Sequence, residues 1–362
     1  IYKMAVFRLF PSKDATLYTK QVDMNTGRDA MLEIGSNKLG EAMRAVIAFD
    51  DTEIASTIDN TVGSTNFSAS LNLYVANAEN LGEDTSVQVH PLAQGWVEGI
   101  GHYLDAPYNA VGVSWKYRDG SVLWDTTSYT NLHPGGDDVG GGTWINEVNG
   151  IILSSSYDHV YKGSVDIVAD ITNFVSASYN GDITNNGLLL KLNIDEFSTG
   201  SLSYLQCFSA DTNTIYYPHL EFQWDDSNYS TDLDPITETS PVDIILKDIR
   251  ESYADTGKVR FRLHARPKYP TKVFRTTNVN LDNYRLPATT YWGIKDEATG
   301  EMVINFNTFA TKVSADATSS YFDVYMDNLF VERYYRVVIK TTLDGTTHII
   351  ESDKPFKLET NG

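Results

Sequence analysis

Cysteine is almost absent from this chain of 362 residues, which holds a single one, Cys207. One thiol can form neither an internal disulfide nor a multi-thiolate metal site, so both are excluded. We expect Cys207 to act as a small apolar side chain on a buried strand. The sequence also lacks any run near the ~18 apolar residues that cross a bilayer, and we therefore expect no membrane partner.

Positive charge is scarce in the first two thirds of the chain. Residues 1–240 carry 32 Asp or Glu and 11 Lys or Arg, a net charge of −21, whereas residues 241–362 carry 16 and 17, a net charge of +1, which together give the −20 of the whole chain. Nucleic-acid binding requires the neutralisation of phosphates, and an acidic surface repels them. No nucleic-acid partner is therefore expected.

The motifs of the common enzyme mechanisms are missing as well. The chain has no GxSxG, HExxH or GxxxxGK[ST] motif, and no two of its seven histidines lie three to five residues apart. Gly99 and Gly101 begin a GxGxxG pattern, but Leu104 replaces its last glycine, so we treat the match as chance. Distant carboxylate pairs, as in glycosidases, leave no local motif. We expect no enzyme activity and no cofactor, and polysaccharide cleavage is the least favoured of three functional hypotheses.

The chain does contain many short segments in which apolar and polar residues alternate. This period of two predicts β-strands, and the Gly, Asn, Asp and Ser residues between them predict turns. The predicted strands of the first part are 4–10, 44–49, 70–75, 86–92, 111–117, 165–168, 187–192, 203–208 and 220–224. Ile171, Phe174 and Val175 instead have helical spacing, between Asp170 and Gly181. The predicted fold is all-β, with an N-terminal jelly-roll β-sandwich that includes one short helix.

Residues 225–241 separate the two parts of different charge. This segment is polar and acidic, holds two prolines and has no apolar period, so it predicts a linker. Strands resume at 242–246, 258–264, 302–306, 321–325, 333–340 and 348–351. About 120 residues with some seven strands suit a smaller immunoglobulin-like sandwich. The predicted organisation is a jelly-roll domain at 1–224, a linker at 225–241 and a second β-sandwich at 242–362.

A glycine-rich loop, HPGGDDVGGG at 133–142, contains two adjacent acidic residues, Asp137 and Asp138. Their carboxylates are hard oxygen ligands that suit Ca²⁺, but the ion takes six to eight oxygens. The alternative is a solvated turn whose glycines allow positive φ angles, and we favour it. No metal site is therefore expected.

Aromatic residues crowd between positions 96 and 144 and permit two interpretations. They are Trp96, Tyr103, Trp115, Tyr117, Trp124 and Trp144. Exposed aromatic platforms allow β-sandwich modules to stack on sugar rings. The core of a large sandwich also takes up such residues, and this interpretation is the favoured one. We predict that Trp115 and Trp124 are buried and required for folding.

A series of sequence motifs occurs in the order seen in one β-sandwich family. They are PSKDATLY (11–18), MNTGRDAMLEIG (24–35), RAVIAFD (44–50), ASLNLYV (69–75), GWVEG (95–99), SWKY (114–117), HPGGDD (133–138), VDIVADITNFV (165–175), NNGLLLKL (185–192) and PHLEFQW (218–224). Together they resemble the DNRLRE-type jelly-roll domain, which is similar to carbohydrate-binding module family 96. Some relatives bind polysaccharide and many are structural. The resemblance implies a fold-defining loop, and not an active centre, made of Trp115, Trp124, Pro134, Gly135, Gly136 and Asp137.

The arrangement of the whole chain, from YKMAVFRLFPSKDATLY (2–18) to ERYYRVVIKTTLDGTTHIIESDKPFKL (332–358), resembles virion structural proteins of tailed marine phages, cyanophages in particular. This resemblance implies a non-enzymatic component of the neck, tail or fibre adaptor. Its location would be the virion, after synthesis in the host cytoplasm, and its partners other virion proteins and further copies of itself. The second hypothesis is a carbohydrate-binding module that recognises a host surface polysaccharide, which is compatible with a place in a receptor-binding fibre.

The second part of the chain holds a cluster of cations interleaved with aromatic residues. The candidate interface residues are Arg260, Arg262, Arg266, Lys268 and Tyr269. Arg and aromatic side chains are enriched at the centres of protein interfaces, although scattered surface solvation explains the same pattern equally well. The hypothesis is contact with an acidic surface, either the first domain of a neighbouring copy or another virion protein.

Overall fold

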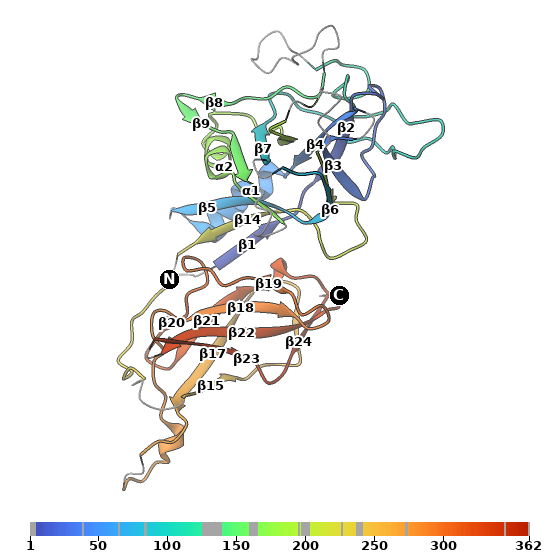
Figure 1. Cartoon of the computed structure of the whole chain (residues 1–362). Helices are drawn as coiled ribbons and strands as arrows, with labels where there is room; N and C mark the ends of the chain where they lie inside the picture. Colours follow the sequence, from blue (N-terminus) through green and yellow to red (C-terminus); the bar gives the residue numbers. More distant parts are fainter. Residues whose placement is uncertain are drawn as a thin grey trace. The chain divides into compact units, whose positions relative to one another are not determined.

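The structure, a computed structural model, consists mainly of β-strands, and the all-β sandwich prediction is confirmed (Figure 1). It describes residues 5–37, 40–63, 66–82, 85–124, 140–158, 166–194, 196, 203–225, 227–236, 242–271, 274–343 and 345–360. The chain forms two compact units. The N-terminal unit comprises Leu9–Ser64 and Ser68–Glu221, and the C-terminal unit comprises Ile1–Arg8, Thr65–Phe67 and Phe222–Gly362.

The strands of the first two thirds of the chain form two main sheets. Their bounds are β1 (Ala5–Leu9), β2 (Lys13–Tyr18), β3 (Met31–Ser36), β4 (Ala42–Ala48), β5 (Phe67–Leu73), β6 (Val75–Glu79), β7 (Ser86–Pro91), β10 (Ser155–Asp158), β11 (Ile167–Asp170), β12 (Leu188–Leu192), β13 (Tyr204–Phe208) and β14 (His219–Trp224), with a small hairpin of β8 (Glu147–Val148) and β9 (Ile151–Ile152). The larger sheet has the order β10-β7-β12-β4-β3-β13-β6, and β2 also pairs with β4. The smaller sheet has the order β1-β14-β5-β11.

Strand β4 lies inside the larger sheet and is buried along its whole length. A nearly continuous apolar run of this length predicts such a strand, because neither face meets water. Val46 of β4 pairs with Ala15 of β2 on one side and with Leu189 of β12 on the other. These three residues belong to a core that also contains Trp96, Trp115 and Trp124. Cys207 of β13 is buried, as predicted, and burial raises the pKa of its thiol to about 12.

The predicted helix is present as α2 (Thr172–Tyr179), which buries Phe174 and Val175. The backbone N–H of Thr172 donates to the carboxylate of Asp170 at 2.9 Å, just before the helix. This bond satisfies one of the amides that a helix N-terminus leaves without an intrahelical partner. Among the described residues, no helix is long and apolar enough to cross a membrane.

The expectation of one helix was wrong, because a second helix, α1 (Asp51–Thr57), precedes it and continues into the π-helix η1 (Ile58–Val62). Asp50 caps α1 by accepting hydrogen bonds from two backbone N–H groups of its first turn. The buried residues Ile54, Ile58 and Val62 lie four positions apart. This is the spacing of one helix face, so the signal was present in the sequence.

The predicted strand at 111–117 was also wrong. Gly112 has a φ of +113°, which an extended strand does not allow. The side chain of Asn25 donates to the carbonyl oxygen of Val113 at 2.8 Å, and the N–H of Lys116 donates to the carbonyl oxygen of Val22 at 3.0 Å. A β-strand forms its hydrogen bonds with a neighbouring strand. This segment instead forms them with the buried side chain of Asn25 and with the loop residue Val22.

The C-terminal unit is a β-sandwich of two sheets. The elements are β15 (Val242–Lys247), β16 (Ser252–Ala254), β17 (Lys258–Pro267), β18 (Tyr291–Asp296), β19 (Met302–Ile304), β20 (Ser314–Ala315), β21 (Ser320–Tyr325), β22 (Tyr334–Leu343), β23 (Thr346–Glu351) and β24 (Phe356–Glu359), with the 3-10 helices η2 (Val279–Leu281) and η3 (Met326–Asn328). One sheet has the order β15-β17-β21-β20 and the other β16-β24-β22-β18-β19, with β23 paired to β22. Trp292 of β18 stacks on Phe322 of β21 with ring centroids 5.2 Å apart, so aromatic rings from both sheets meet in the core.

The predicted linker is bonded to the C-terminal unit over its described residues, 225 and 227–236. Asp225 forms an ion pair with Lys312 at 2.7 Å, and the carbonyl oxygen of Asn228 accepts from the N–H of Ala315 at 3.0 Å. Ile236 is buried. This part of the segment is therefore packed against the sandwich, because its polar groups find partners that composition alone does not reveal. Residues 237–241 lie outside the described residues.

Candidate functional site

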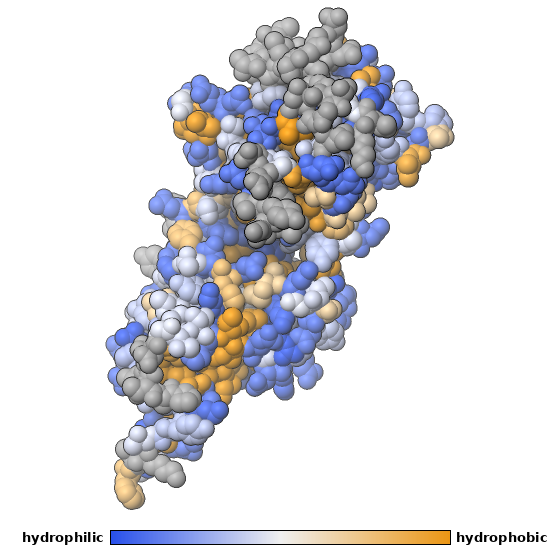
Figure 2. Space-filling view, viewed as in Figure 1, coloured by the Kyte–Doolittle hydropathy of each residue, from blue (hydrophilic) through white to orange (hydrophobic). Residues whose placement is uncertain are grey.

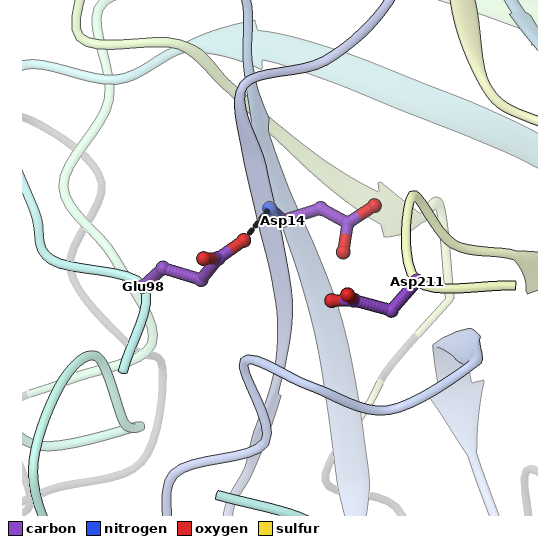
Figure 3. Close-up of side chains that lie close together, drawn as sticks. All are labelled: Asp14, Glu98 and Asp211. Atoms are coloured by element: carbon purple, nitrogen blue, oxygen red, sulfur yellow. Dashed lines mark hydrogen bonds between the residues drawn. The ribbon is translucent and has the colours of Figure 1, made fainter. Parts of the chain in front are cut away.

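Three acidic side chains from separate segments converge in the N-terminal unit (Figure 3). Asp14 lies on β2, Glu98 lies in the loop after β7, and Asp211 lies in the turn after β13. One carboxylate oxygen from each residue lies within 4.8 Å of the other two. We call this group the carboxylate cluster.

Backbone hydrogen bonds set the geometry of the carboxylate cluster. The N–H of Asp14 donates to Oε1 of Glu98 at 3.1 Å, as the dashed line in Figure 3 shows. The N–H of Ala210 donates to Oδ2 of Asp14 at 2.7 Å, and the N–H of Asp211 donates to Oγ of Ser209 at 3.0 Å. Strand β2 and two connecting segments are therefore tied together at this point.

A buried amide holds the loop that carries Glu98. Asn25 is fully buried; its Nδ2 donates to the carbonyl oxygens of Glu98 and Val113, and its Oδ1 accepts from the N–H of Gly101 at 2.8 Å. A Cβ atom at Gly99 or Gly101 would lie 2.3 Å from an oxygen of Asn25. Gly99 and Gly101, whose match to the GxGxxG pattern we treated as chance, thus have a structural role. Only glycine allows Asn25 to approach this closely.

The cluster carries perturbed acid groups. Burial raises the pKa of Asp14 to about 7, and the neighbouring carboxylates of Asp211 and Glu98 add to the effect. The hydrogen bond from Ala210 and the charge of Arg28 act in the opposite direction. Burial likewise raises the pKa of Glu98. Near neutral pH, Asp14 therefore carries a proton for much of the time.

Arg28 supplies the positive charge beside the cluster. Its guanidinium lies 3.0 Å from Oδ1 of Asp211 and 3.6 Å from Oε2 of Glu98. Ca²⁺ takes six to eight oxygen ligands, and two of the three acids already pair with Arg28. Asp14, Glu98 and Asp211 are the residues that would hold a cation. As they stand, the three acids and Arg28 form an internal charge network.

Accessibility decides what chemistry the cluster supports. Asp14 is only 1% exposed, so no polymer reaches its carboxyl group. Paired carboxylates cleave glycosidic bonds when the substrate lies between them. The cluster joins segments of the fold, and only the partly exposed side chains of Glu98 and Asp211 reach its surface.

Trp115 and Trp124 of the predicted loop are buried, as predicted. Nε1 of Trp124 donates to the carbonyl oxygen of Ser114 at 3.1 Å, and the guanidinium of Arg44 lies 4.8 Å from the ring of Trp115. The remaining candidates, Pro134, Gly135, Gly136 and Asp137, together with Asp138, lie outside the described residues.

The other aromatic residues of this region differ in exposure. Trp96 is buried, with Nζ of Lys13 located 4.3 Å from its ring centroid. Trp144 is half-buried and packs beside His90 at 5.2 Å. The four tryptophans therefore point mainly into the core, and the aromatic platform that would favour sugar stacking is not formed by them.

The candidate interface residues lie on β17 and just beyond it. Arg260 binds Asp323 through two hydrogen bonds of 2.8 and 3.0 Å. Arg262 pairs with Asp316 at 3.0 Å, and Arg266 pairs with Asp243 at 2.9 Å. These three guanidiniums are neutralised within the C-terminal unit, which the sequence did not reveal. Lys268 and Tyr269 lie past the end of the strand and are exposed.

Comparisons with known proteins add little to this picture. No protein family and no curated protein matches the sequence. A DUF4785 family protein from Legionella pneumophila is 8% identical, with a TM-score of 0.17 over 99% of this chain and 63% of that one. A protein assigned as a beta-galactosidase from Bacteroides fragilis is 10% identical, with a TM-score of 0.18 over 97% of this chain and 41% of that one. The chain spans less than two thirds of either protein, and similarity this low supports no conclusion.

Proposed function

We propose that the chain is a non-enzymatic structural protein of a tailed phage virion, placed in the neck, tail or fibre adaptor, which attaches through protein–protein contacts. Its resemblance to virion proteins of marine phages supports the setting. The observation that supports attachment is the full exposure of Phe274, at 111%, on a segment that extends from the C-terminal sandwich. Tyr269 and Leu281 of the same segment are exposed as well, and several exposed apolar side chains on one segment are typical of an interaction site.

The polar residues of the N-terminal unit fit a structural role. Trp115 and Trp124 belong to a buried core, and two acids of the carboxylate cluster accept hydrogen bonds from backbone N–H groups of other segments. A jelly-roll domain and an immunoglobulin-like domain would act as two rigid modules, one docked on the particle and the other directed outward. Sandwiches of this kind keep unpaired strand edges short.

The experiment is mass spectrometry of phage particles purified on density gradients, together with immunogold labelling of this chain. The expected result is a fixed copy number per particle and label at one position along the neck or tail. A capsid protein serves as the positive control and an early-expressed phage protein as the negative control. Absence of the chain from purified particles would refute the proposal.

A further inference from the structure

Between β17 and β18, the described residues 268–271 and 274–283 belong to an arm that leaves the C-terminal sandwich and returns to it. Figure 1 shows this segment in orange, extending away from both sheets. The chain returns where the N–H of Tyr284 donates to the carbonyl oxygen of Ala265 at 2.8 Å. Asn283 fastens the base, since its Oδ1 accepts from the N–H of Ala265 at 3.0 Å and its Nδ2 donates to the carbonyl oxygen of Thr318 at 2.9 Å.

Hydrogen bonds also organise the described part of the arm further out. Asn278 caps η2 by accepting from the N–H of Asn280 at 3.0 Å. Arg275 donates to the carbonyl oxygen of Thr277 at 3.0 Å and forms an ion pair with Asp282. Residues 275–282 of the arm are thus fixed by their own hydrogen bonds, which lowers the entropy cost of binding.

The arm exposes three large apolar side chains. Tyr269 is 72% exposed, Phe274 111% and Leu281 74%. Figure 2 shows apolar atoms at the far end of this segment. Aromatic side chains presented on an ordered segment are typical anchors of protein interfaces.

The charge of the arm indicates the kind of partner. Residues 268–283 hold three Lys or Arg and one Asp, a net charge of +2, and Arg275 is paired with Asp282. Lys268 is exposed and forms no ion pair within the described part of the chain. The N-terminal unit holds 27 Asp or Glu and 9 Lys or Arg, a net charge of −18. Charge complementarity therefore favours the N-terminal unit of another copy over a nucleic acid or an anionic lipid surface, both of which that unit repels.

The N-terminal unit carries a matching apolar surface. Residues 99–111, which we call the apolar loop, expose Ile100 at 65%, Leu104 at 89%, Tyr108 at 50% and Val111 at 65%. The sequence from Glu98 to Val111 contains two acidic residues and no Lys or Arg. Because Asn25 fixes the base of the apolar loop, this surface is ordered as well.

We infer that the arm of one molecule docks on the apolar loop of a second copy, in a head-to-tail contact. This inference deepens the proposed structural function and rests on it for the setting. Two different surfaces meet in such a contact, so it forms rings where the geometry closes and open chains where it does not. Rings and stacked chains are the assemblies from which a neck or tail is built.

Sedimentation velocity of the full chain over a range of concentrations tests the contact. We expect wild-type protein to form oligomers as concentration rises, and less so as NaCl increases, because salt screens the charges. Phe274→Ser and Leu104→Ser should each weaken association at least tenfold while leaving the melting temperature unchanged. Ile349→Ser, which alters an exposed residue of β23 outside both surfaces, is the matched control and should associate like wild type.

Mixing the two variants gives the decisive measurement. Each variant keeps one intact surface, so an equimolar mixture should form heterodimers and nothing larger. Wild-type protein that stays monomeric, variants that associate like wild type, or a mixture that stays monomeric would each overturn the inference. The inference would also be overturned if wild-type protein stayed monomeric and bound phosphatidylserine vesicles in a way that depends on Phe274. That result would assign the arm to a lipid surface.

The outcome is separable from that of the proposed function. Self-association is measured on the purified chain, whereas the proposed function is measured on particles. A chain that is found in particles but does not self-associate refutes this inference alone, and a self-associating chain that is absent from particles refutes the proposed function alone.

Discussion

The guanidinium of Arg44 lies 2.7 Å from the carboxylate of Glu196, and both side chains are only 2% exposed. Arg44 also donates to the carbonyl oxygen of Gly141 at 2.9 Å and lies near the rings of Trp115 and Trp144. The pair fastens central strand β4 to two connecting segments of the N-terminal unit. Its charges are desolvated, so each depends on the other.

We predict that Arg44→Met lowers the free energy of unfolding by roughly 3 to 5 kcal/mol, because it leaves the Glu196 carboxylate buried without a partner. Adding Glu196→Met should recover part of the loss. Urea unfolding measures both changes. The matched control is Lys295→Met, which breaks the more exposed ion pair with Glu351 and should cost about 1 kcal/mol or less. Equal losses for Arg44→Met and the control would contradict this prediction.

Asp14 should make stability depend on pH. Its pKa is about 7 in the folded chain, against about 3.9 when unfolded. The folded state therefore keeps a proton that the unfolded state releases, and the contribution of Asp14 to stability falls as pH rises from about 4 to about 7. Asp14→Asn cannot ionise, so its stability relative to wild type should increase over this range.

Urea unfolding at pH 5 and pH 8 measures that difference. The carboxamide oxygen of the variant can still accept the hydrogen bond from Ala210, which limits other effects of the change. Asp182→Asn, at an exposed position, is the control. A difference between wild type and Asp14→Asn that is the same at both pH values would show that Asp14 ionises normally.

Gly99→Ala should destabilise the N-terminal unit by roughly 2 to 5 kcal/mol, because strain at positive φ adds to a clash. Gly99 has a φ of +87°, and a Cβ atom there would lie 2.3 Å from Oδ1 of Asn25. Gly150→Ala is a matched control, since Gly150 has a φ of +78° and no atom within 4 Å of the added carbon. It should cost about 1 kcal/mol, from strain alone. Thermal unfolding of both variants checks the prediction, which fails if they melt together.

Replacing Trp115 or Trp124 with Ala should cost roughly 3 to 5 kcal/mol, the usual loss for a buried aromatic side chain. Thermal unfolding and a glycan array, run on the same variants, separate the core role from the carbohydrate hypothesis. Trp→Ala variants that keep the wild-type melting temperature and lose glycan binding would favour carbohydrate recognition.

Charge reversal on β17 should now affect folding as well as any interface. Arg260→Glu faces Asp323, which is 3% exposed, so we expect a loss of roughly 1.5 to 3 kcal/mol in the C-terminal unit. Arg262→Glu faces Asp316, whose side chain is 32% exposed, and should cost about 1 kcal/mol or less. Differential scanning calorimetry distinguishes the two variants. Identical unfolding transitions for both would contradict the assigned roles.

Sequence patterns predicted the strands that bury one face. The segment 203–208 appears as β13, in which buried and partly exposed residues alternate, with Cys207 inside. In the segment 111–117, apolar and polar residues alternate, yet its hydrogen-bond partners are Asn25 and loop residues. An alternating pattern shows which side chains are apolar, but it does not show whether a neighbouring strand is present.

The carboxylate cluster was beyond sequence reasoning. Asp14 and Glu98 are separated by 84 residues, and the chain contains 48 acidic residues from which to choose a set. The local signal was the spacing of Gly99 and Gly101, which marks a close approach of backbone to another group but does not identify that group as Asn25. In the same way, the arginines of β17 were visible in the sequence, whereas their partners Asp323, Asp316 and Asp243 were not.

The fastening of β1 has a consequence for how the chain is made. The N–H of Arg8 donates to Oδ1 of Asn328 at 2.7 Å, and Nδ2 of Asn328 donates to the carbonyl oxygen of Val6 at 2.9 Å, across 320 and 322 residues. On the ribosome, β1 therefore cannot form these bonds until a further 320 residues have been synthesised. Contacts between residues this far apart in sequence slow folding. Until they form, the side chain of Asn328 lacks the two hydrogen-bond partners that it has in the folded C-terminal unit.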